Sequence, residues 1–369
     1  MKKHCKRLLA ALLAAGLLGS LTACGGQTDT SAEPAADMAA DTTSDTAADT
    51  VYDLSVGQMG TGIKSSMVVL AHELGLYEKE GLNVTFSDIS SLNDGIVAIN
   101  AGKLDILPFG VIPTCTFYAQ GADLVIFGGT IAEGSQAVCK PEVQETYASL
   151  EGFRGKTVAC VRPETGHMIM KAKLREAGIT PGEDVTFVEL DGMQSVVEAV
   201  SKGEADVGFV NSGFGQNAQK QGLVIAFDVA DYAPNAVCCR QTASGQAVRE
   251  NPEPYIRFQT ANLEAYKRYL EEPQQCIDTL TAYSGLEPEY VENCLYDGVM
   301  KVTMDPMAVR CEEFYDSMRA NGDIAADAPE DLGEAVNSDV YAQALARMHA
   351  RYPDWDAYDT LKTAFDENN

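Results

Sequence analysis

The middle of the chain contains an internal repeat, and this repeat restricts the possible folds more than any other feature of the sequence. When the sequence is shifted by 101 residues against itself, 84–86 falls on 185–187 and 97–106 falls on 198–207. Each copy predicts a strand, a short polar turn, a helix that ends before Gly, and a further strand. The repeat therefore predicts two similar units of alternating strands and helices.

Upstream segments extend both copies. Strands at 54–57 and 157–161 enter helices that end near residues 75–76 and 178–179, so each unit reads β-α-β-α-β. Alternating elements of this type form a mostly parallel sheet with helices on both faces. The predicted fold class is α/β, with two Rossmann-like lobes. Two connecting strands, around 130–140 and 229–240, pass between the lobes and form a two-strand hinge.

After residue 251 the pattern changes to helices, which are separated by prolines. They are expected at 261–271, 274–284, 289–295, 305–321, 338–351 and 355–365. This helical C-terminal tail is expected to pack on the first lobe, with Trp355 as a packing residue. The predicted domains are a signal peptide at 1–23, a lipidated and disordered acidic linker at 24–50, lobe 1 at 51–135 plus 236–369, and lobe 2 at 136–235.

The first residues predict export and lipid attachment. Four basic residues precede an apolar run at 8–18, which is shorter than the roughly 20 residues needed to span a bilayer. The ending Leu21-Thr22-Ala23-Cys24 resembles the lipobox of bacterial lipoproteins, which implies that Cys24 carries the lipid. A secreted chain with an incidental Cys at this position is the alternative.

Charge and composition restrict the classes of molecule that the chain is expected to bind. Residues 25–50 hold six acidic residues and no Lys or Arg, which predicts a disordered tether. The full chain carries a formal charge of −27, and −31 without the four basic residues of the leader. Such a charge argues against nucleic acid as a partner. The membrane is expected to be reached through the lipid anchor only, and the chain is expected to be a monomer.

Eight cysteines remain after Cys5 and Cys24, and their spacing predicts no metal site because no C-x-x-C pair or nearby His accompanies them. An even number outside the cell permits disulfides, for which Cys276 and Cys294 on neighbouring predicted helices are candidates. Buried free thiols are the alternative. Four histidines without an acidic cluster also argue against a transition-metal site, and no cofactor is expected.

Several segments together resemble the substrate-binding proteins of ABC importers of the nitrate/sulfonate/taurine type (SsuA/THI5-like, NMT1-type). The segments are 55–58 with 75–84, the Leu150–Ala159 phrase at the entry to the second lobe, and Gly203–Val207. The resemblance implies a periplasmic-binding-protein fold of type II and an ABC permease and ATPase complex as partner. Departures are Phe153-Arg154, inserted in the entry phrase, and Asn211-Ser212-Gly213 where a proline is often found.

Ligands of open α/β sheets lie at the carboxyl ends of the strands, so the turns that lead into helices are the candidate site. Arg162, beside a predicted helix start, could bind a carboxylate or sulfonate in bidentate fashion, or could form an ion pair on the rim. The resemblance to the family's G-x-Q opening implies that Gln58 donates a hydrogen bond to the ligand. The alternative is that Gln58 is a solvent-facing turn residue. The predicted ligand-binding residues are Gln58, Thr61, Ser90, Ser91, Asn93, Thr114, Arg162, Thr165, His167, Asp191, Met193, Asn211 and Ser212.

These expectations combine into one function. The chain is expected to be a lipid-anchored, extracytoplasmic, non-enzymatic receptor that encloses a small organic solute, a sulfonate, carboxylate or heterocycle, between two lobes. Motifs of nucleophilic, phosphate-binding or zinc-dependent enzymes are missing from the sequence, which disfavours an enzyme on the same fold. A ligand-sensing surface lipoprotein is the other alternative.

Overall fold

A computed structural model describes residues 50–369 of the protein. The predicted signal peptide, the lipidation site Cys24 and the acidic tether up to residue 49 lie outside the described residues and stay predictions. Within the described range no helix combines the length and the hydropathy that crossing a bilayer requires.

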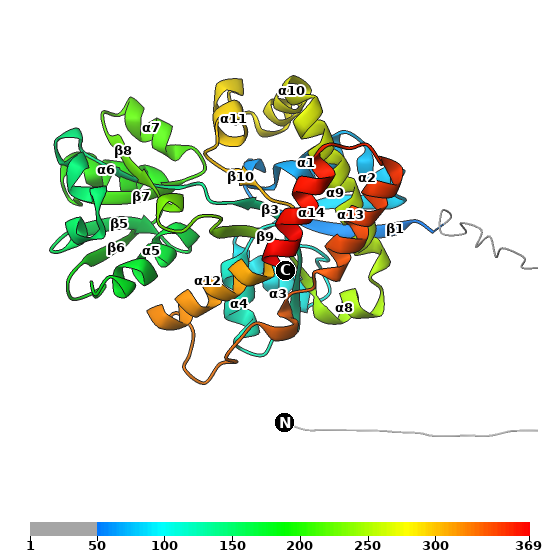
Figure 1. The fold of residues 1–369 in the computed structure, drawn as a ribbon, viewed down its shortest axis with the longest axis horizontal. Helices are drawn as coiled ribbons and strands as arrows, with labels where there is room; N and C mark the ends of the chain where they lie inside the picture. Colours follow the sequence, from blue (N-terminus) through cyan, green and yellow to red (C-terminus); the bar gives the residue numbers. More distant parts are fainter. Residues whose placement is uncertain (1–49) are drawn as a thin grey trace, which may run out of the picture. The chain divides into compact units, whose positions relative to one another are not determined.

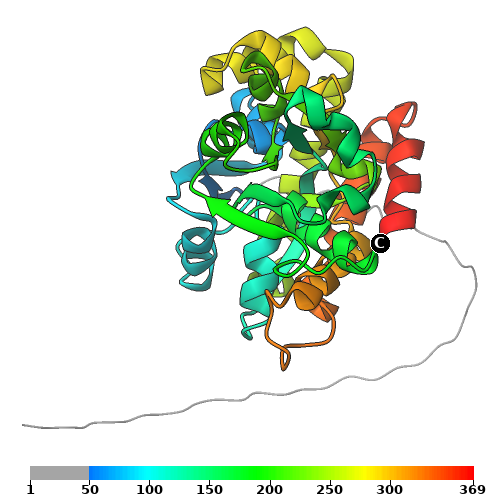
Figure 2. The same cartoon turned by 90° about the vertical axis from the view of Figure 1, so that its left-hand side faces the viewer.

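The strands fall into two groups that belong to two lobes (Figure 1). Lobe 1, as we use the name, carries β1, β2, β3, β9 and β10, and lobe 2 carries β4 to β8. The strands are β1 (Tyr52–Gln58), β2 (Leu82–Asp88), β3 (Leu124–Ala132), β4 (Ser135–Cys139), β5 (Thr157–Val161), β6 (Thr186–Leu190), β7 (Val207–Asn211), β8 (Val224–Asp228), β9 (Val237–Ser244) and β10 (Lys301–Val302). Figure 2 shows the same ribbon with lobe 2 toward the viewer.

Lobe 2 is a five-stranded sheet in the order β6-β5-β7-β4-β8. β5 pairs in parallel with β6 and β7, whereas β4 runs antiparallel to β7 and β8. Successive residues of β5 point to opposite faces, so Val158 and Cys160 join one hydrophobic cluster and Ala159 joins another. The helices that cover these faces are α5 (Thr165–Glu176), α6 (Met193–Lys202) and α7 (Phe214–Lys220).

Lobe 1 resembles lobe 2, but its strands form two sheets, β1-β2 and β10-β3-β9. β1 pairs in parallel with β2 over their full length, and the helices are α1 (Ser66–Glu73), α2 (Leu76–Lys79), α3 (Leu92–Asn100) and α4 (Val111–Tyr118). The predicted third strand near 104–106 is reduced to two bridges, Val56 with Ile106 and Leu107 with Thr242. The Asp105 carboxylate accepts hydrogen bonds from the Ser55 N–H and hydroxyl, so side-chain contacts replace part of the expected ladder.

Two crossings join the lobes, as the repeat predicts. β3 of lobe 1 leads into β4 of lobe 2, and the chain returns from β8 through η5 (Val229–Asp231) into β9. β3 and β9 pair antiparallel with three register shifts. The buried guanidinium of Arg240 fixes this region, because it donates to the carbonyl oxygens of Ile131 and Asp305.

The tail is helical, as predicted. Its helices are α8 (Gly245–Glu250), α9 (Glu253–Glu271), α10 (Pro273–Ser284), α11 (Pro288–Leu295), α12 (Ala308–Asn321), α13 (Asp339–Arg351) and α14 (Ala357–Asn368). α9 begins at Glu253 and not at the expected residue 261, and α8 was not expected; the other five helices begin and end close to the expected residues. α9 packs on α1 and α2 of lobe 1, and Trp355 is buried in the same core. α12 also packs on α5 of lobe 2, where the Asn321 amide donates to the Met168 carbonyl. The tail therefore contacts both lobes.

Candidate functional site

A cavity of about 1010 Å³ lies between the lobes and is lined by both. Lobe 1 contributes the turn after β1, the segment 109–112 at the start of α4, and the beginning of β9. Lobe 2 contributes the turn before α5 and the residues that end β7 and begin α7, and α11 of the tail covers one side. The carboxyl ends of parallel strands thus face one another across the cavity, as expected for open α/β sheets.

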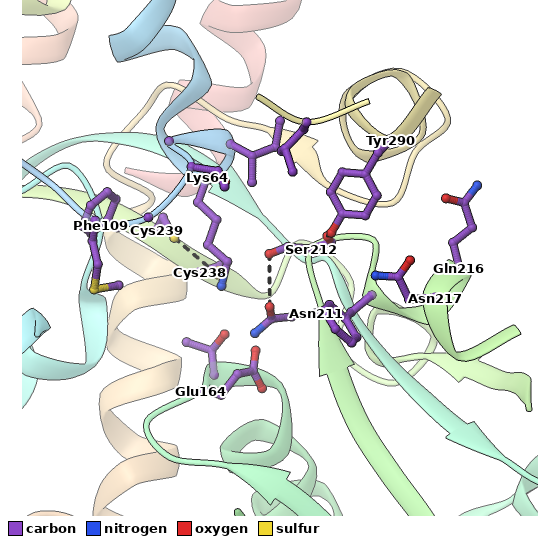
Figure 3. A pocket seen from close by; sticks show the side chains of 18 of the residues that line it. Lys64, Phe109, Glu164, Asn211, Ser212, Gln216, Asn217, Cys238, Cys239 and Tyr290 are labelled. Atoms are coloured by element: carbon purple, nitrogen blue, oxygen red, sulfur yellow. Dashed lines mark hydrogen bonds between the residues drawn. The ribbon is translucent and has the colours of Figure 1, made fainter. Parts of the chain in front are cut away.

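Lys64 is the central cation of the site. It lies in η2 (Ile63–Ser65) directly before α1, and its side chain extends toward Asn211 of lobe 2 (Figure 3). Burial lowers the pKa of Lys64, but the nearby groups Cys238, Cys239 and Glu164 together raise it by more than burial lowers it. The net pKa shift is therefore upward. The ammonium stays charged at neutral pH, and no described residue forms a hydrogen bond or an ion pair with it. It can therefore pair with an anionic group of a ligand.

The turn that presents Lys64 depends on glycine. Gly60 and Gly62 both have positive φ angles, 67° and 71°. A Cβ on Gly62 would lie 2.9 Å from Val69 Cγ2 and 3.0 Å from the Tyr283 ring, which is too close. Two glycines thus let the chain turn tightly from β1 into η2, and the side chain of Lys64 is held in the cavity.

Glu164 occupies the equivalent turn of lobe 2, but its charge is already satisfied. It is the N-cap of α5 and accepts hydrogen bonds from the Gly166 N–H at 2.8 Å, the His167 N–H at 3.3 Å and the Ser135 hydroxyl at 2.7 Å. Burial raises the pKa of Glu164, whereas His167, Lys64 and Ser135 lower it, with a net value of about 2. The carboxylate fixes the helix start and faces the cavity as a permanent anion.

Amide and aromatic groups complete the wall. Asn211 accepts the Ser212 hydroxyl at 3.1 Å through its side-chain oxygen, so its NH2 group can donate to a ligand. Tyr290 of α11 reaches across and donates its hydroxyl to the Ser212 carbonyl at 2.5 Å, and Cys294 donates to the same oxygen at 3.3 Å. Many other side chains that line the cavity are apolar or amide-bearing: Met59, Ile63, Leu92, Phe109, Val111, Ile112, Phe214, Gln216, Asn217 and Leu286. The exposed charged residues Lys220, Glu287 and Glu289 also line it.

Four residues predicted from the sequence line this cavity: Thr61, Thr165, Asn211 and Ser212. The structure also brings together the turns 58–64 and 162–167, which the two-lobed interpretation requires. Whether these residues bind a ligand stays a prediction.

The other predicted site residues do not line the cavity. Gln58 is buried beneath the turn, where its side-chain oxygen accepts the Ser65 hydroxyl. Thr114 is buried and contacts the Thr242 hydroxyl, and His167 packs beside Glu164. Arg162 has a side chain that is 70% exposed and pairs with Glu189 at 2.7 Å, so the ion-pair alternative describes it, with a partner that the sequence did not suggest.

The second turns, which follow the second strand of each lobe at residues 90–93 and 191–193, contribute little to the cavity wall. Ser91 is the N-cap of α3, and both Ser90 and Ser91 donate to the Asp94 carboxylate. Of the residues in these two turns only Leu92 lines the cavity, and Asn93, Asp191 and Met193 do not. The capping role that is usual for such residues explains Ser91.

The sequence reasoning did not select the most prominent residues of the cavity. Lys64, Glu164 and the segment 109–112 lie in or beside turns that lead from a strand into a helix, which the sequence predicts as the site. Their positions were therefore predictable, although these residues were not selected. Tyr290 and the adjacent Cys238 and Cys239 carried none, because they come from the tail and from the hinge.

All eight cysteines of the described range are buried free thiols. The disulfide considered for Cys276 and Cys294 is not formed, and the alternative of free thiols describes the structure. Residues 50–369 also hold no group of three or more His, Cys, Asp or Glu side chains placed to bind a metal ion.

Comparison with known proteins identifies the family. The profile described as NMT1/THI5 like matches residues 63–276, which is more than half of the chain. The chain belongs to the NMT1/THI5-like family. The resemblance seen in the sequence is thereby confirmed at the level of the family.

One curated relative and two solved structures illustrate what the chain is similar to. A Brucella abortus protein named "Putative binding protein BAB2_1146" is 23% identical over 242 residues, which cover 64% of the chain and 73% of the relative. The periplasmic aliphatic sulphonate binding protein SsuA from Escherichia coli superposes with a TM-score of 0.66 and 17% identity, over 79% of this chain and 99% of SsuA. The ligand-binding component of an ABC-type import system from Staphylococcus aureus gives 0.64 and 14%, over 79% and 99%. The fold is therefore that of periplasmic binding proteins, as predicted.

Proposed function

We propose that this protein is the solute-binding receptor of an ABC importer and that it encloses one small organic solute between its lobes. The observation that carries the proposal is the cavity of about 1010 Å³, whose wall is shared by lobe 1, lobe 2 and α11. A solute that contacts both lobes stabilises the closed arrangement over an open one, and a permease can recognise the closed form. Family membership and the import-system relative support the same role.

The cavity favours a solute with one anionic group. Lys64 offers an unpaired ammonium, and Asn211 on the opposite lobe offers amide N–H donors, whereas Glu164 already accepts three hydrogen bonds. The apolar lining around Phe109, Phe214 and Leu286 suits a hydrocarbon or ring attached to that group. Among the sequence-based classes, organic sulfonates and carboxylates therefore fit better than uncharged heterocycles.

The position of the protein in the cell belongs to the same proposal. Cys24 would carry the lipid, residues 25–50 would tether the lobes outside the membrane, and the protein would work as a monomer that leaves its solute chemically unchanged. Globomycin, which blocks cleavage of lipoprotein leaders, should cause the uncleaved precursor to accumulate, and Cys24→Ser should remove the lipid. A mature protein that carries no lipid in the unaltered chain would contradict the anchor.

A thermal-shift screen tests the binding function. The protein from residue 50 onward is heated with alkanesulfonates, aromatic sulfonates, aromatic carboxylates and neutral heterocycles. A solute present at a hundred times its Kd should stabilise the fold by about 2.7 kcal/mol, which is readily seen as a higher Tm. Stabilisation by a sulfonate or carboxylate, with the compound recovered unchanged, is expected. If no compound of any class raises the Tm, or if the bound compound is consumed, the proposal fails.

A further inference from the structure

Cys238 and Cys239, which are adjacent in the sequence, both lie in the cavity wall. In a regular strand the side chains of neighbouring residues point to opposite faces. Here Ile131 of β3 pairs with Cys239 and Ala132 pairs with Val237, so Cys238 is an extra residue in β9. Such a β-bulge redirects the side chains of its strand. As a result the two sulfur atoms lie 3.6 Å apart, and both residues line the cavity.

The pair also lies beside a cation. Lys64 extends to the Cys238 side of the cavity in Figure 3. The hydrogen bond with the Cys239 thiol and the charge of Lys64 lower the pKa of Cys238 to about 7 against the opposing effect of burial, while Cys238 and burial raise the pKa of Cys239. The other six cysteines of residues 50–369 lie outside the cavity lining, and burial raises the pKa of each of them, which keeps them protonated and unreactive.

We propose that Cys238 and Cys239 form a dithiol modification site that reacts with small disulfides entering the cavity and closes to a disulfide between the two residues. The Cys238 thiolate attacks one sulfur of the small disulfide, which forms a mixed disulfide and releases one thiolate. Cys239 then loses its proton, attacks the Cys238 sulfur and releases the second thiolate, and each released thiolate takes up one proton. The two cysteines are oxidised by two electrons, and the small disulfide is reduced to two thiols.

The bond should be reversible. The Cα atoms of adjacent residues are about 3.8 Å apart, which is shorter than the separation that most disulfides span, and such strain makes a disulfide easier to reduce. Excess thiol should therefore restore the dithiol, so the site can follow the balance of thiols and disulfides outside the cell.

Oxidation should also change solute binding, a consequence that rests on the proposed function. The disulfide removes the thiolate next to Lys64 and alters the bulge at the start of β9, the strand by which the chain returns from lobe 2. Both changes affect the wall that the solute contacts.

Intact-mass measurement tests the site without any solute. The reduced protein from residue 50 onward is incubated with oxidised glutathione at pH 7.5, then unfolded in guanidinium chloride and treated with an alkylating agent so that every remaining thiol reacts. We expect the loss of two hydrogens, no attached glutathione, and six alkylated cysteines, with the bond located in the peptide that contains both 238 and 239. Attached glutathione without loss of the two hydrogens, oxidation at other cysteines, or no reaction would overturn the proposal.

Three variants separate the steps. Cys239→Ser should stop at the mixed disulfide and gain one glutathionyl group at Cys238. Cys238→Ser should gain no glutathionyl group at Cys239. Lys64→Met should slow the first step at least threefold at pH 7.5, whereas Lys103→Met, an exposed lysine of lobe 1, should not. Should the cysteine variants fail to fold, phenylarsine oxide, which bridges paired thiols, should add once to the unaltered reduced protein and block the reaction with oxidised glutathione; failure to add would contradict the site.

A second arm separates this inference from the solute-binding function. The thermal shift caused by benzenesulfonate is compared between the reduced and the oxidised protein. A shift that is at least halved on oxidation and returns after reduction supports the link to the cavity, and equal shifts would contradict that link. If neither form responds to any screened solute, the solute-binding proposal fails while the mass result still decides the dithiol site.

Discussion

The corresponding first turns of the two lobes bring opposite charges to the same cavity. In lobe 1 the turn after β1 presents Lys64, which has no partner among the described residues, and in lobe 2 the turn after β5 presents Glu164, which accepts three hydrogen bonds. The corresponding turns of the two lobes therefore have different roles. The lobe 1 turn is free to bind a ligand, whereas the lobe 2 turn uses its charge to build its own helix start.

The largest effect should come from the free cation of lobe 1. Lys64→Met removes the buried ammonium of the cavity wall, whereas the other lining lysine of the described residues, Lys220, is exposed. Loss of one partner of an enclosed charge pair costs about 2 kcal/mol or more, roughly a 30-fold weaker Kd. Isothermal titration with an anionic solute from the screen measures the change. Lys103→Met, the same substitution on an exposed part of lobe 1, should leave the Kd unchanged. Equal affinities of Lys64→Met and the unaltered protein would show that the two turns do not differ in this way.

The satisfied anion of lobe 2 should act on stability rather than on charge recognition. Its pKa is about 2 in the folded protein and near 4.5 when unfolded. Because the unfolded state binds the proton more readily, the contribution is complete above about pH 5 and is lost as the pH falls toward 2.

Glu164→Gln should therefore lower the free energy of unfolding by about 2 kcal/mol at pH 7, since charged hydrogen bonds to Gly166 and Ser135 are weakened. Urea unfolding at pH 7 and pH 3 measures this difference, which should shrink at pH 3. Glu198→Gln on the exposed face of α6 is the matched control and should change stability by less than about 0.5 kcal/mol. A difference between Glu164→Gln and the unaltered protein that grows toward low pH would contradict the assignment.

Closure of the two lobes should depend on a close approach at Gly213. This residue has a φ of 77°, and a Cβ there would lie 2.6 Å from Cys294 Sγ of α11. Gly213→Ala should separate α11 from lobe 2 and weaken solute binding about five- to tenfold, because the added Cβ overlaps Cys294 Sγ when α11 lies against lobe 2.

Tyr290→Phe, which removes only the hydrogen bond to the Ser212 carbonyl, should have the smaller effect of about threefold. Small-angle scattering with solute bound should show a larger radius of gyration for Gly213→Ala. Gly222→Ala, a lobe 2 glycine with positive φ and open space around it, is the control for backbone strain. An equal loss of affinity in Gly222→Ala would mean that strain, and not closure, is responsible.

The smallest effect should come from Arg162, although the sequence makes it a candidate for binding an anion. Its guanidinium is mostly exposed and paired with Glu189. Exposed ion pairs contribute between zero and about 1 kcal/mol, so Arg162→Ala should change the Kd of an anionic solute less than twofold. Isothermal titration decides this, and a loss as large as that of Lys64→Met would move the anion site to the rim of lobe 2.

The repeat made the positions of the turns predictable but not the work of each side chain. Periodicity and the Gly residues at helix ends determine where strands meet helices, so the two lobes, the crossings and most tail helices could be inferred. The direction of a side chain at a turn depends on contacts that are distant in sequence. Gln58 turns inward because Ser65 meets it, and Arg162 turns outward because Glu189 lies on the neighbouring strand.

The unpredicted part of the wall comes from segments outside the repeat. Tyr290 reaches the cavity only because α11 packs above lobe 1, and Cys238 faces the cavity only because one extra residue shifts the register between β3 and β9. Neither tertiary packing nor a one-residue bulge has a periodic signature in the sequence.

Hydrogen exchange with and without a bound sulfonate or carboxylate tests the central comparison most directly. The account predicts slower exchange on binding in the first and third turns of both lobes, residues 60–64, 109–112, 163–165 and 211–214, and little change at the second turns, residues 90–93 and 191–193. Protection confined to one lobe, or strongest at the second turns, would contradict the enclosure of a solute between the two lobes.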